Sequence, residues 1–585
     1  MRFDVKIVNG TVVDGTGSRP RPADVGIRGG RIVEVGACEA PADRVIDATG
    51  AIVTPGWTDM HTHYDGQVTW DEELAPSCYH GVTTVVMGSC GVGFAPVRSS
   101  DHARLIALME GVEDIPGSAL AEGIVWRWET FPQYMDALDA MPHVIDFACM
   151  VPHDPVRVYV MGERAIAGES ATEEDIYMMQ RVVREALKAG AVGFSTGRTD
   201  NHRDSTGAHT PSSEASEREL TGLAKALQGL RHGVLQAVSD FDMTESPDRF
   251  DGEFDLLEKM ANAVPDHGMS ISLMQRIRAP QQWRQILARV EDCATAGLDM
   301  RVQVGARGIG VLLGLEATFH PFIGFPSYLA IADQPLEARV ARMRDPAFKA
   351  RLLSESSQPV SGDGSPIPPL VDVLLAQIDL VAMRTYRLPD PVDYEPEDAD
   401  SLAAEAARKG ESSLSVLYDA LLEEDGQALL YFPIYNYLEG NLDIVETMLK
   451  HPQALPGLSD GGAHVGTICD ASMPTYMLIH WARDRDRGIP LEQVVKMMSH
   501  DTSRFLGMSD RGTLEVGARA DVNVIDLGRL TLRKPRLVAD LPAGGKRMLQ
   551  DAEGYVATLV AGEVILENDR LTGARPGRLV RMGAS

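Results

Sequence analysis

The segment VTPGWTDMHTHYD, residues 53–65, carries two histidines separated by a single residue. Side chains of an extended strand alternate between two faces, so His61 and His63 point the same way, and Asp59 joins them. Two neutral imidazoles on one face suit a divalent transition metal such as zinc. Two structural histidines in a turn would give the same pattern, and these residues alone leave that alternative open.

A cysteine follows in the segment MGSCGVG, where Cys90 comes just after the apolar run Val82–Met87. A thiolate at this position could bind a metal, and soft sulfur favours zinc over magnesium. A lone cysteine is more often a small buried apolar residue. Both interpretations remain open from the residues themselves.

The elements that must position these side chains alternate between strand-like and helix-like runs, which predicts a parallel sheet. With a strand before His61, there is one more strand than an eight-stranded barrel needs. In such barrels the active site lies at the carboxyl ends of the strands, where His61 and Cys90 fall. The expected strands are Val82–Met87, Val144–Val151, Ala191–Ser195, Val234–Val238, Ser270–Met274, Met300–Val304, Leu429–Ile434 and Leu458–Ser459.

One helix is especially clear, from Thr172 to Ala189, because its apolar residues recur at helical spacing. Ser170 and Glu173 are expected to form a capping box at its start. Gly190 is expected to end it.

Both ends of the chain consist of short strand-like runs with glycine-rich turns. We therefore predict an α/β fold, a TIM-like (β/α)₈ barrel of residues 56–510 with a small β-sandwich made from residues 1–55 and 511–585. Residues 305–425 show helical runs without the alternation of strands and helices that is typical of the barrel. This stretch is predicted to be an insertion, with a lid as its candidate role.

Composition limits the partners and the compartment. The 585 residues exceed a single domain, and the formal net charge of −29 would repel nucleic acids and anionic membranes. The six cysteines are scattered and form no CxxC pair, which favours reduced thiols. The N-terminus does not resemble a signal peptide, and no segment is apolar enough to span a bilayer. We expect a soluble cytoplasmic protein that binds neither nucleic acid nor membrane, while its oligomeric state is not predicted.

Longer motifs resemble a known family. VTPGWTDMHTH, together with GTLEVGARADVNVID at residues 512–526, is similar to the amidohydrolase superfamily. Residues 61–96, HTHYDGQVTWDEELAPSCYHGVTTVVMGSCGVGFAP, more narrowly resemble the D-aminoacylase (N-acyl-D-amino-acid deacylase) branch. The resemblance covers nearly the whole chain and implies a metal-dependent hydrolase of C–N bonds.

The resemblance also implies roles for individual residues. Zinc would be held by His61, His63 and Cys90, the cysteine replacing the carboxylated lysine of many relatives. Asp460, in the segment LSDGGAH, would touch the metal, accept a proton from the attacking water and pass it to the leaving nitrogen. An aspartate that caps a turn is the alternative. His464, four residues on, is a candidate for orienting the substrate, with a hydrogen-bonded loop histidine as the alternative.

The chain departs from the family where the fifth and sixth strands normally each supply a histidine. Val238 and Leu273 are expected at about those positions, with Gln236, Asp240 and Gln275 nearby. One zinc ion per chain is therefore expected, with two as the alternative. His153 and His202 are further candidates for lining the site, with ordinary loop histidines as the alternative.

The expected substrate is a small-molecule linear amide, such as an N-acyl-D-amino acid. Its carboxylate would need an arginine, and Arg198 and Arg307, each just past a predicted barrel strand, are candidates. A hydantoinase-like hydrolase of cyclic amides is an alternative that the missing lysine counts against. A barrel with a degraded metal site, which binds a ligand without turnover, is the other.

Overall fold

The computed structural model describes residues 2–242, 246–361 and 370–583. At its centre, eight parallel strands form one sheet in the order β18-β14-β13-β12-β11-β10-β9-β8. Thr62 pairs with Gly461 in parallel, and the backbone N–H of His63 donates to the carbonyl of Gly461 at 2.8 Å. These contacts join the two edges, which confirms the predicted TIM-like barrel. The strands are β8 (Trp57–Asp59), β9 (Val82–Met87), β10 (Asp146–Pro152), β11 (Gly193–Arg198), β12 (Val234–Ser239), β13 (Met269–Leu273), β14 (Met300–Val304) and β18 (Ala454–Pro456).

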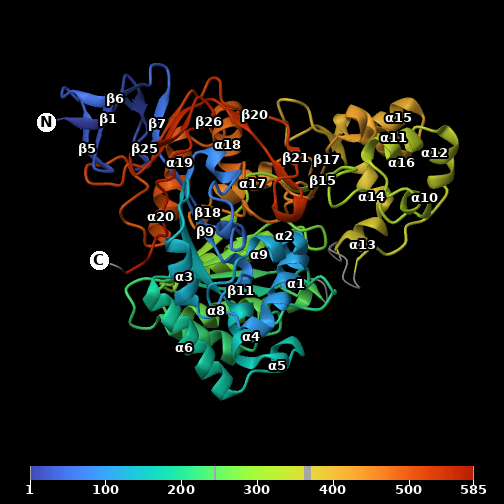
Figure 1. Ribbon diagram of the computed structural model, residues 1–585, viewed down its shortest axis with the longest axis horizontal. Helices are drawn as coiled ribbons and strands as arrows, with labels where there is room; N and C mark the ends of the chain where they lie inside the picture. Colours follow the sequence, from blue (N-terminus) through green and yellow to red (C-terminus); the bar gives the residue numbers. More distant parts are fainter. Residues whose placement is uncertain (1, 243–245, 362–369, 584–585) are drawn as a thin grey trace.

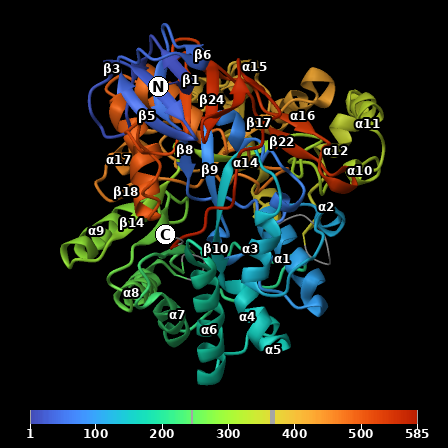
Figure 2. The same ribbon diagram turned by 60° about the vertical axis from the view of Figure 1, so that its left-hand side comes forward.

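Helices surround these strands (Figure 2). Every residue of β9, β10, β11 and β13 is buried, as expected for parallel strands covered on both faces. The helices that follow barrel strands are α1 (His102–Glu113), α2 (Gly117–Gly123), α3 (Phe131–Asp139), α4 (His153–Met161), α5 (Glu163–Ile166), α6 (Glu173–Ala189), α7 (Glu217–Ala224), α8 (Phe250–Asn262), α9 (Gln282–Thr295), α17 (Asp443–Leu449), α18 (Met473–Tyr476), α19 (Leu491–Lys496) and α20 (Thr502–Phe505).

The predicted helix at residues 172–189 is α6, but its cap differs from the expected one. The capping box joins Thr172 and Asp175 rather than Ser170 and Glu173. Thr172 is the last residue with extended backbone, so its hydroxyl is the group that reaches the N–H of Asp175. Gly190, at φ +111°, ends the helix as predicted.

One predicted barrel strand belongs elsewhere. The run Leu429–Ile434 corresponds to β17 (Leu430–Tyr435), which pairs antiparallel with β15 (Ile309–Leu313) and β16 (Tyr386–Arg387) outside the barrel. A short apolar run indicates a buried strand but not the sheet that it joins. The last barrel strand, β18, ends two residues before the predicted Leu458–Ser459.

The two ends of the chain meet in one β-sandwich, as predicted (Figure 1). In its seven-stranded sheet, β19 pairs antiparallel with β7, so Val524 lies opposite Val53. Side chains of both sheets, including Val5, Ile27 and Leu559, share one hydrophobic core. The sheets are β26 (Arg570–Leu571), β25 (Glu563–Glu567), β24 (Tyr555–Val560), β19 (Val522–Ile525), β7 (Ile52–Pro55), β2 (Thr11–Val12) and β3 (Arg21–Pro22), and β5 (Arg31–Gly36), β4 (Asp24–Arg28), β1 (Phe3–Val8) and β6 (Ala42–Asp47).

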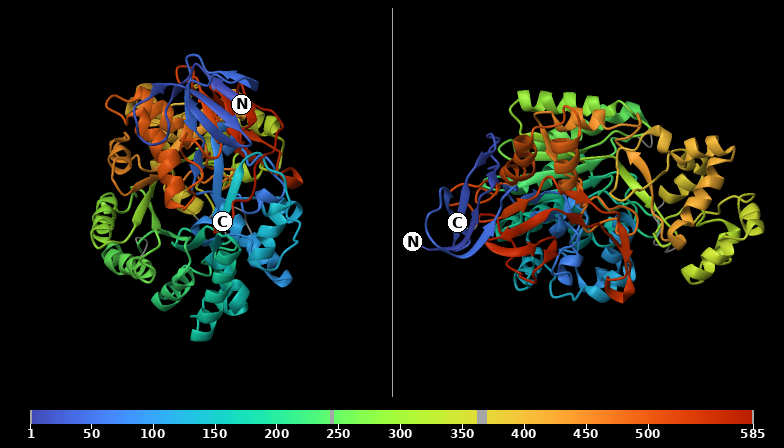
Figure 3. Two further views of the ribbon diagram at one scale, coloured as in Figure 1. Left: turned by 90° about the vertical axis from the view of Figure 1, so that its left-hand side faces the viewer. Right: turned by 90° about the horizontal axis from the view of Figure 1, so that it is seen from above.

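A separate helical lobe with its own core projects from the end of the molecule opposite the N-terminal strands (Figure 3). Its hydrophobic core draws on residues from Val311 to Ile434. The domain boundaries and the insertion limits given above stay predictions. None of the helices in the described ranges is long and apolar enough to cross a membrane. The lobe contains α10 (Pro326–Leu329), α11 (Leu336–Met343), α12 (Pro346–Leu352), α13 (Leu370–Leu375), α14 (Ile378–Met383), α15 (Leu402–Lys409) and α16 (Ser413–Leu421).

Candidate functional site

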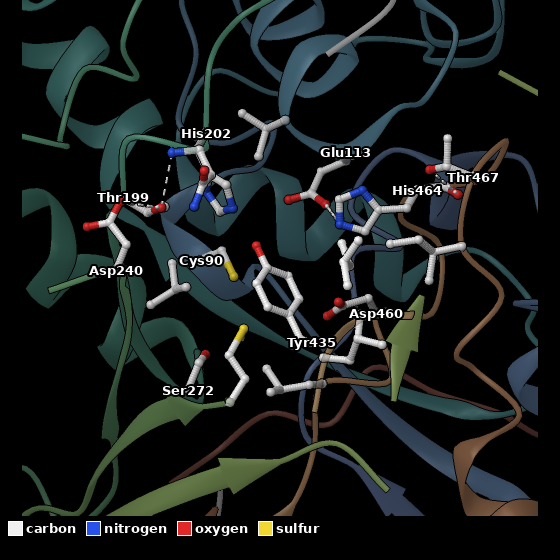
Figure 4. A pocket seen from close by; sticks show the side chains of 18 of the residues that line it. Cys90, Glu113, Thr199, His202, Asp240, Ser272, Tyr435, Asp460, His464 and Thr467 are labelled. Atoms are coloured by element: carbon white, nitrogen blue, oxygen red, sulfur yellow. Dashed lines mark hydrogen bonds and ion pairs between the residues drawn. The ribbon is translucent and has the colours of Figure 1, made fainter. Parts of the chain in front are cut away.

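A cavity of about 180 Å³ opens at the carboxyl ends of the barrel strands (Figure 4). Different strands contribute its polar residues, because the loops that follow parallel strands converge at one end of a barrel. The chain following β8 brings His61 and His63, the β9 turn brings Cys90, the loop after β11 brings His202, and the loop after β18 brings Asp460 and His464.

Four of these side chains face a common point. Nε2 of His61 lies 3.2 Å from Sγ of Cys90 and 3.4 Å from Oδ1 of Asp460. Nε2 of His63 lies 3.8 Å from the same Asp460 oxygen. Donor atoms of His61, His63 and Cys90 all lie within 4.8 Å of one another. One ion with ordinary zinc–ligand lengths of about 2.0–2.3 Å can reach donors at this spacing.

The ring nitrogen of His61 that faces away from Cys90 and Asp460 is hydrogen-bonded to the side-chain amide of Gln303. This nitrogen, Nδ1, lies 2.5 Å from Oε1 of Gln303, whose Nε2 donates to Oγ of Ser270 at 2.9 Å. Because an amide oxygen only accepts, the imidazole proton is on Nδ1 and the lone pair of Nε2 faces Cys90 and Asp460. This is the tautomer that a metal ligand requires.

The loops carrying Cys90, Asp460 and His464 have unusual backbone conformations. These three non-glycine residues have φ values of +57°, +48° and +49°. Such left-handed conformations persist only where the surroundings hold them, and they cluster at functional sites. The backbone N–H of Cys90 is held by Oε1 of Gln236 at 2.9 Å. The strain is consistent with loops shaped to aim these side chains.

The electrostatics of the site fit a bound cation. Burial raises the pKa of Asp460 to about 7. Burial, reinforced by Glu113, Asp460 and Asp65, raises the pKa of the Cys90 thiol well above its usual value. Burial lowers the pKa of His63 well below its usual value. A thiolate and a carboxylate are costly here without a nearby positive charge, and the neutral imidazoles do not supply one. Two imidazoles, a sulfur and a carboxylate are the donor types that zinc prefers.

Besides Oγ of Ser272, three buried polar atoms of the cavity lining have no hydrogen-bond partner among the described residues. They are Nδ1 of His63, Oε1 of Glu113 and Oδ1 of Asp460. Buried polar groups without partners are rare in folded proteins, so they point to a missing ligand or to a functional role.

Neither arginine predicted to bind the substrate reaches the cavity, which corrects that prediction. Arg198 is buried and donates through Nη2 to Oε2 of Glu253 at 3.0 Å. Arg307 donates to Oδ1 of Asp470 at 2.9 Å and stacks over the ring of Tyr394. A position just past a strand does not place an arginine in the cavity, because both guanidinium groups are paired with carboxylates inside the protein.

Two other candidates lie behind the cavity wall. Asp59 was expected on the same face as the two histidines, but β8 ends at this residue. Its carboxylate accepts hydrogen bonds from the hydroxyl of Ser459 and from the backbone N–H of His61. Nδ1 of His153 lies 2.9 Å from Oγ1 of Thr196, and its Nε2 lies 3.1 Å from Oε1 of Glu219. The side chain of His153 does not line the cavity. His202 does line it.

No histidine replaces the two that β12 and β13 would carry in the family. Val238 lines the cavity as expected, but Ser272 and Met274 line it in place of Leu273, which alternation turns to the other face. Nε2 of Gln275 donates to Glu439 at 2.9 Å, and this residue does not line the cavity. Asp240 lines the cavity, with its oxygens engaged by Thr199 and by backbone N–H groups.

Sequence reasoning missed two charged residues of the cavity. Arg276 lies three residues past the end of β13, so the criterion that selected Arg198 and Arg307 also applies to it. It is 4% exposed and donates to the carbonyl of Ser239 at 2.6 Å, and no carboxylate of the described residues lies within ion-pair distance. Glu113, the last residue of α1, had no motif to mark it.

The helical lobe and its β-strands supply the apolar wall of the cavity, and no sequence pattern marked the individual residues of this wall. This wall is made of Ile309, Val311, Phe319, Val371, Leu374 and Ile434, with Ile468 beside them.

Comparisons with known proteins agree with this architecture. A model described as "Amidohydrolase family" matches residues 44–566. D-aminoacylase of Alcaligenes xylosoxydans xylosoxydans is 28% identical over 591 residues, covering 100% of this chain and 98% of that protein. N-acyl-D-glutamate deacylase of the same organism is 28% identical over 598 residues, with the same coverage. A solved D-aminoacylase, described as having a binuclear metal centre with one-metal activation and second-metal attenuation, is 25% identical with a TM-score of 0.63. That match covers 99% of this chain and 100% of the other.

Proposed function

The chain belongs to the amidohydrolase family, and from that premise we propose that it hydrolyses the amide bond of N-acyl-D-amino acids with the help of one bound zinc ion. The observation that carries this proposal is the convergence of His61, His63, Cys90 and Asp460 on one point of a buried cavity. The names of the full-length relatives support the substrate class.

Each residue of the cluster has a distinct task in this proposal. Zinc held by His61, His63 and Cys90 would supply a Lewis acid that polarises the amide carbonyl and makes a neighbouring water more acidic. Asp460 accepts the proton of that water and delivers it to the leaving nitrogen. His464, at the cavity wall, is placed to orient the substrate.

The walls of the cavity favour one metal ion over two. The ends of β12 and β13 present Val238, Ser272 and Met274, none of which is a good zinc ligand. Among the described residues, only His61, His63 and Cys90 form a group with metal-ligand spacing. We therefore expect a stoichiometry of one zinc per chain, unlike the binuclear centre described for the solved D-aminoacylase.

We expect Arg276 to bind the carboxylate of the substrate. It is the one arginine or lysine among the described residues lining the cavity, and it has no acidic partner there. Arg276→Met should raise KM for an N-acyl-amino acid about 30-fold, because a hydrogen bond to a charged group contributes about 2 kcal/mol. The value of kcat should change little, since the contact is made equally in the ground and transition states.

The same kinetics should be measured with the corresponding carboxamide, which has no charge to recognise. The carboxamide should be turned over equally by Arg276→Met and wild type. Arg278→Met, an exposed arginine two residues away, is the matched control and should leave both substrates unaffected. An equal loss on acid and carboxamide would contradict the assignment.

The proposed function is tested by metal analysis of protein purified without chelators, followed by a substrate panel. We expect one zinc per chain, and hydrolysis of N-acyl-D-amino acids in preference to their L-isomers and to hydantoins. Turnover of hydantoins alone would favour the cyclic-amide alternative. Protein without zinc, and inactive after zinc is added, would refute the proposal and favour a ligand-binding barrel.

A further inference from the structure

Glu113 lies between one proposed metal ligand and one wall of the cavity. Its carboxyl group comes from the end of α1 and is only 1% exposed. Oε1 lies 3.2 Å from Nδ1 of His63, and Oε2 lies 3.7 Å from Nε2 of His464. The backbone carbonyl of Glu113 also accepts the N–H of His464 at 2.5 Å. Figure 4 shows the Glu113 side chain directed at the ring of His464. One residue therefore contacts both histidines.

The outward nitrogens of the two proposed histidine ligands are treated differently. His61 is held by the neutral amide of Gln303, whereas His63 faces the carboxyl group of Glu113. Nδ1 of His63 and Oε1 of Glu113 are at hydrogen-bond distance without hydrogen-bond alignment, and neither has another partner in the described ranges. Apo sites often show such loose contacts, which tighten when the site is filled.

The surroundings of Glu113 give it no other role. No lysine or arginine of the described residues lies within ion-pair distance of it. A buried carboxyl group without such a partner is unfavourable for stability, so its position is better explained by what it does at the cavity.

We infer that Glu113 is a positioning residue that accepts the Nδ1 proton of His63, directs Nε2 of that ring at the metal, and holds His464 against the cavity with its second oxygen. The inference rests on the proposed function, because it requires a metal at His63. The inference links the two histidines, because the carboxyl group that orients His63 toward the metal also positions His464 at the cavity wall.

The first test is zinc affinity, measured by competition with a chromophoric chelator on metal-stripped protein. Outer partners of metal-bound histidines typically contribute about 10–100-fold to metal affinity. Glu113→Ala should weaken zinc binding by that factor. Glu113→Gln should lie between Ala and wild type, because its amide oxygen can accept the His63 proton as Gln303 does for His61. The absorption spectrum of the cobalt-loaded protein should also shift in both variants.

Glu219→Gln is the matched control. Glu219 is equally buried and faces His153 at 3.1 Å, but it does not line the cavity. We expect this variant to lose thermal stability while its zinc affinity and cobalt spectrum stay those of wild type. A purely structural Glu113 would behave in the same way as Glu219.

The second test concerns His464. If Glu113 holds this ring, the rise in KM caused by His464→Ala should be much smaller in a Glu113→Ala background than in wild type. Independent effects of the two substitutions would overturn this half of the inference.

The outcomes separate the inference from the proposed function. Wild-type protein that binds zinc no more tightly than Glu113→Ala would overturn the inference and leave the proposed function intact. Wild-type protein that binds no zinc would overturn both. If Glu113→Ala does not fold, Glu113→Gln decides, because it keeps the size of the side chain: zinc affinity and a cobalt spectrum equal to wild type would then refute the role.

Discussion

Asp460→Asn is expected to lower kcat by about 10²–10⁴-fold while zinc stays bound. General acid–base catalysis typically contributes this much, and asparagine can neither accept the proton of water nor return it to the leaving nitrogen. Packing should survive because the two side chains have nearly the same size. The measurements are kcat on an N-acyl-D-amino acid found by the substrate panel, zinc content, and the melting temperature.

Asp154→Asn is the control for losing a buried carboxyl group. Asp154 is fully buried, its pKa is raised to about 6 by burial, and it accepts the N–H of Ser212 away from the cavity. Its substitution should leave kcat within a few fold of wild type. If Asp460→Asn keeps more than about a tenth of wild-type kcat, the proton transfer assigned to Asp460 is wrong. If it fails to fold while Asp154→Asn folds, Asp460 caps its turn and has no catalytic role.

Local patterns were sufficient to predict the barrel and the cluster of His61, His63 and Cys90 at its end. The HTH motif just past the first barrel strand identified His61 and His63, and the motif around Cys90 placed it at the next strand end. These residues are close in sequence to the strands that carry them, so their relation to the barrel end follows from one rule of the fold. Both chain ends consist of short strand-like runs with glycine-rich turns, and this shared pattern predicted that they form one β-sandwich.

The predictions from sequence were wrong where a shift of one residue decides which face of a strand a side chain occupies. Asp59 and His61 are two residues apart, so alternation would place them on one face of a strand. However, β8 ends at Asp59, and alternation does not apply beyond the end of the strand. On β13 the predicted position was Leu273, whereas the cavity faces Ser272 and Met274. A shift of one residue moves a side chain to the opposite face of a strand, so the boundaries of a strand decide which residues reach a site.

Other features depend on contacts that no local pattern encodes. Glu113, at the end of α1, lies 50 residues beyond His63 in the sequence, and its partner His464 comes from the last barrel loop. The run Leu429–Ile434 has the composition of a barrel strand and joins a different sheet. The same lobe contributes Phe319 and Leu374 to the cavity wall, through an arrangement of helices that only the folded chain defines.

Cys90→Ser is expected to remove most of the zinc affinity, and with it the activity. Serine places a hard, protonated hydroxyl where a soft thiolate binds zinc, and the ends of β12 and β13 present Val238, Ser272 and Met274, which are poor replacement ligands. The loss should exceed the roughly 10–100-fold that follows removal of a partner outside the metal's own ligands. Chelator competition and metal analysis measure it. Cys293→Ser, a buried thiol on α9 outside the cavity, should bind zinc as wild type does. If Cys90→Ser retains one tightly bound zinc, the metal is held without the sulfur, and the ligand set of His61, His63 and Cys90 is wrong even if the enzyme is active.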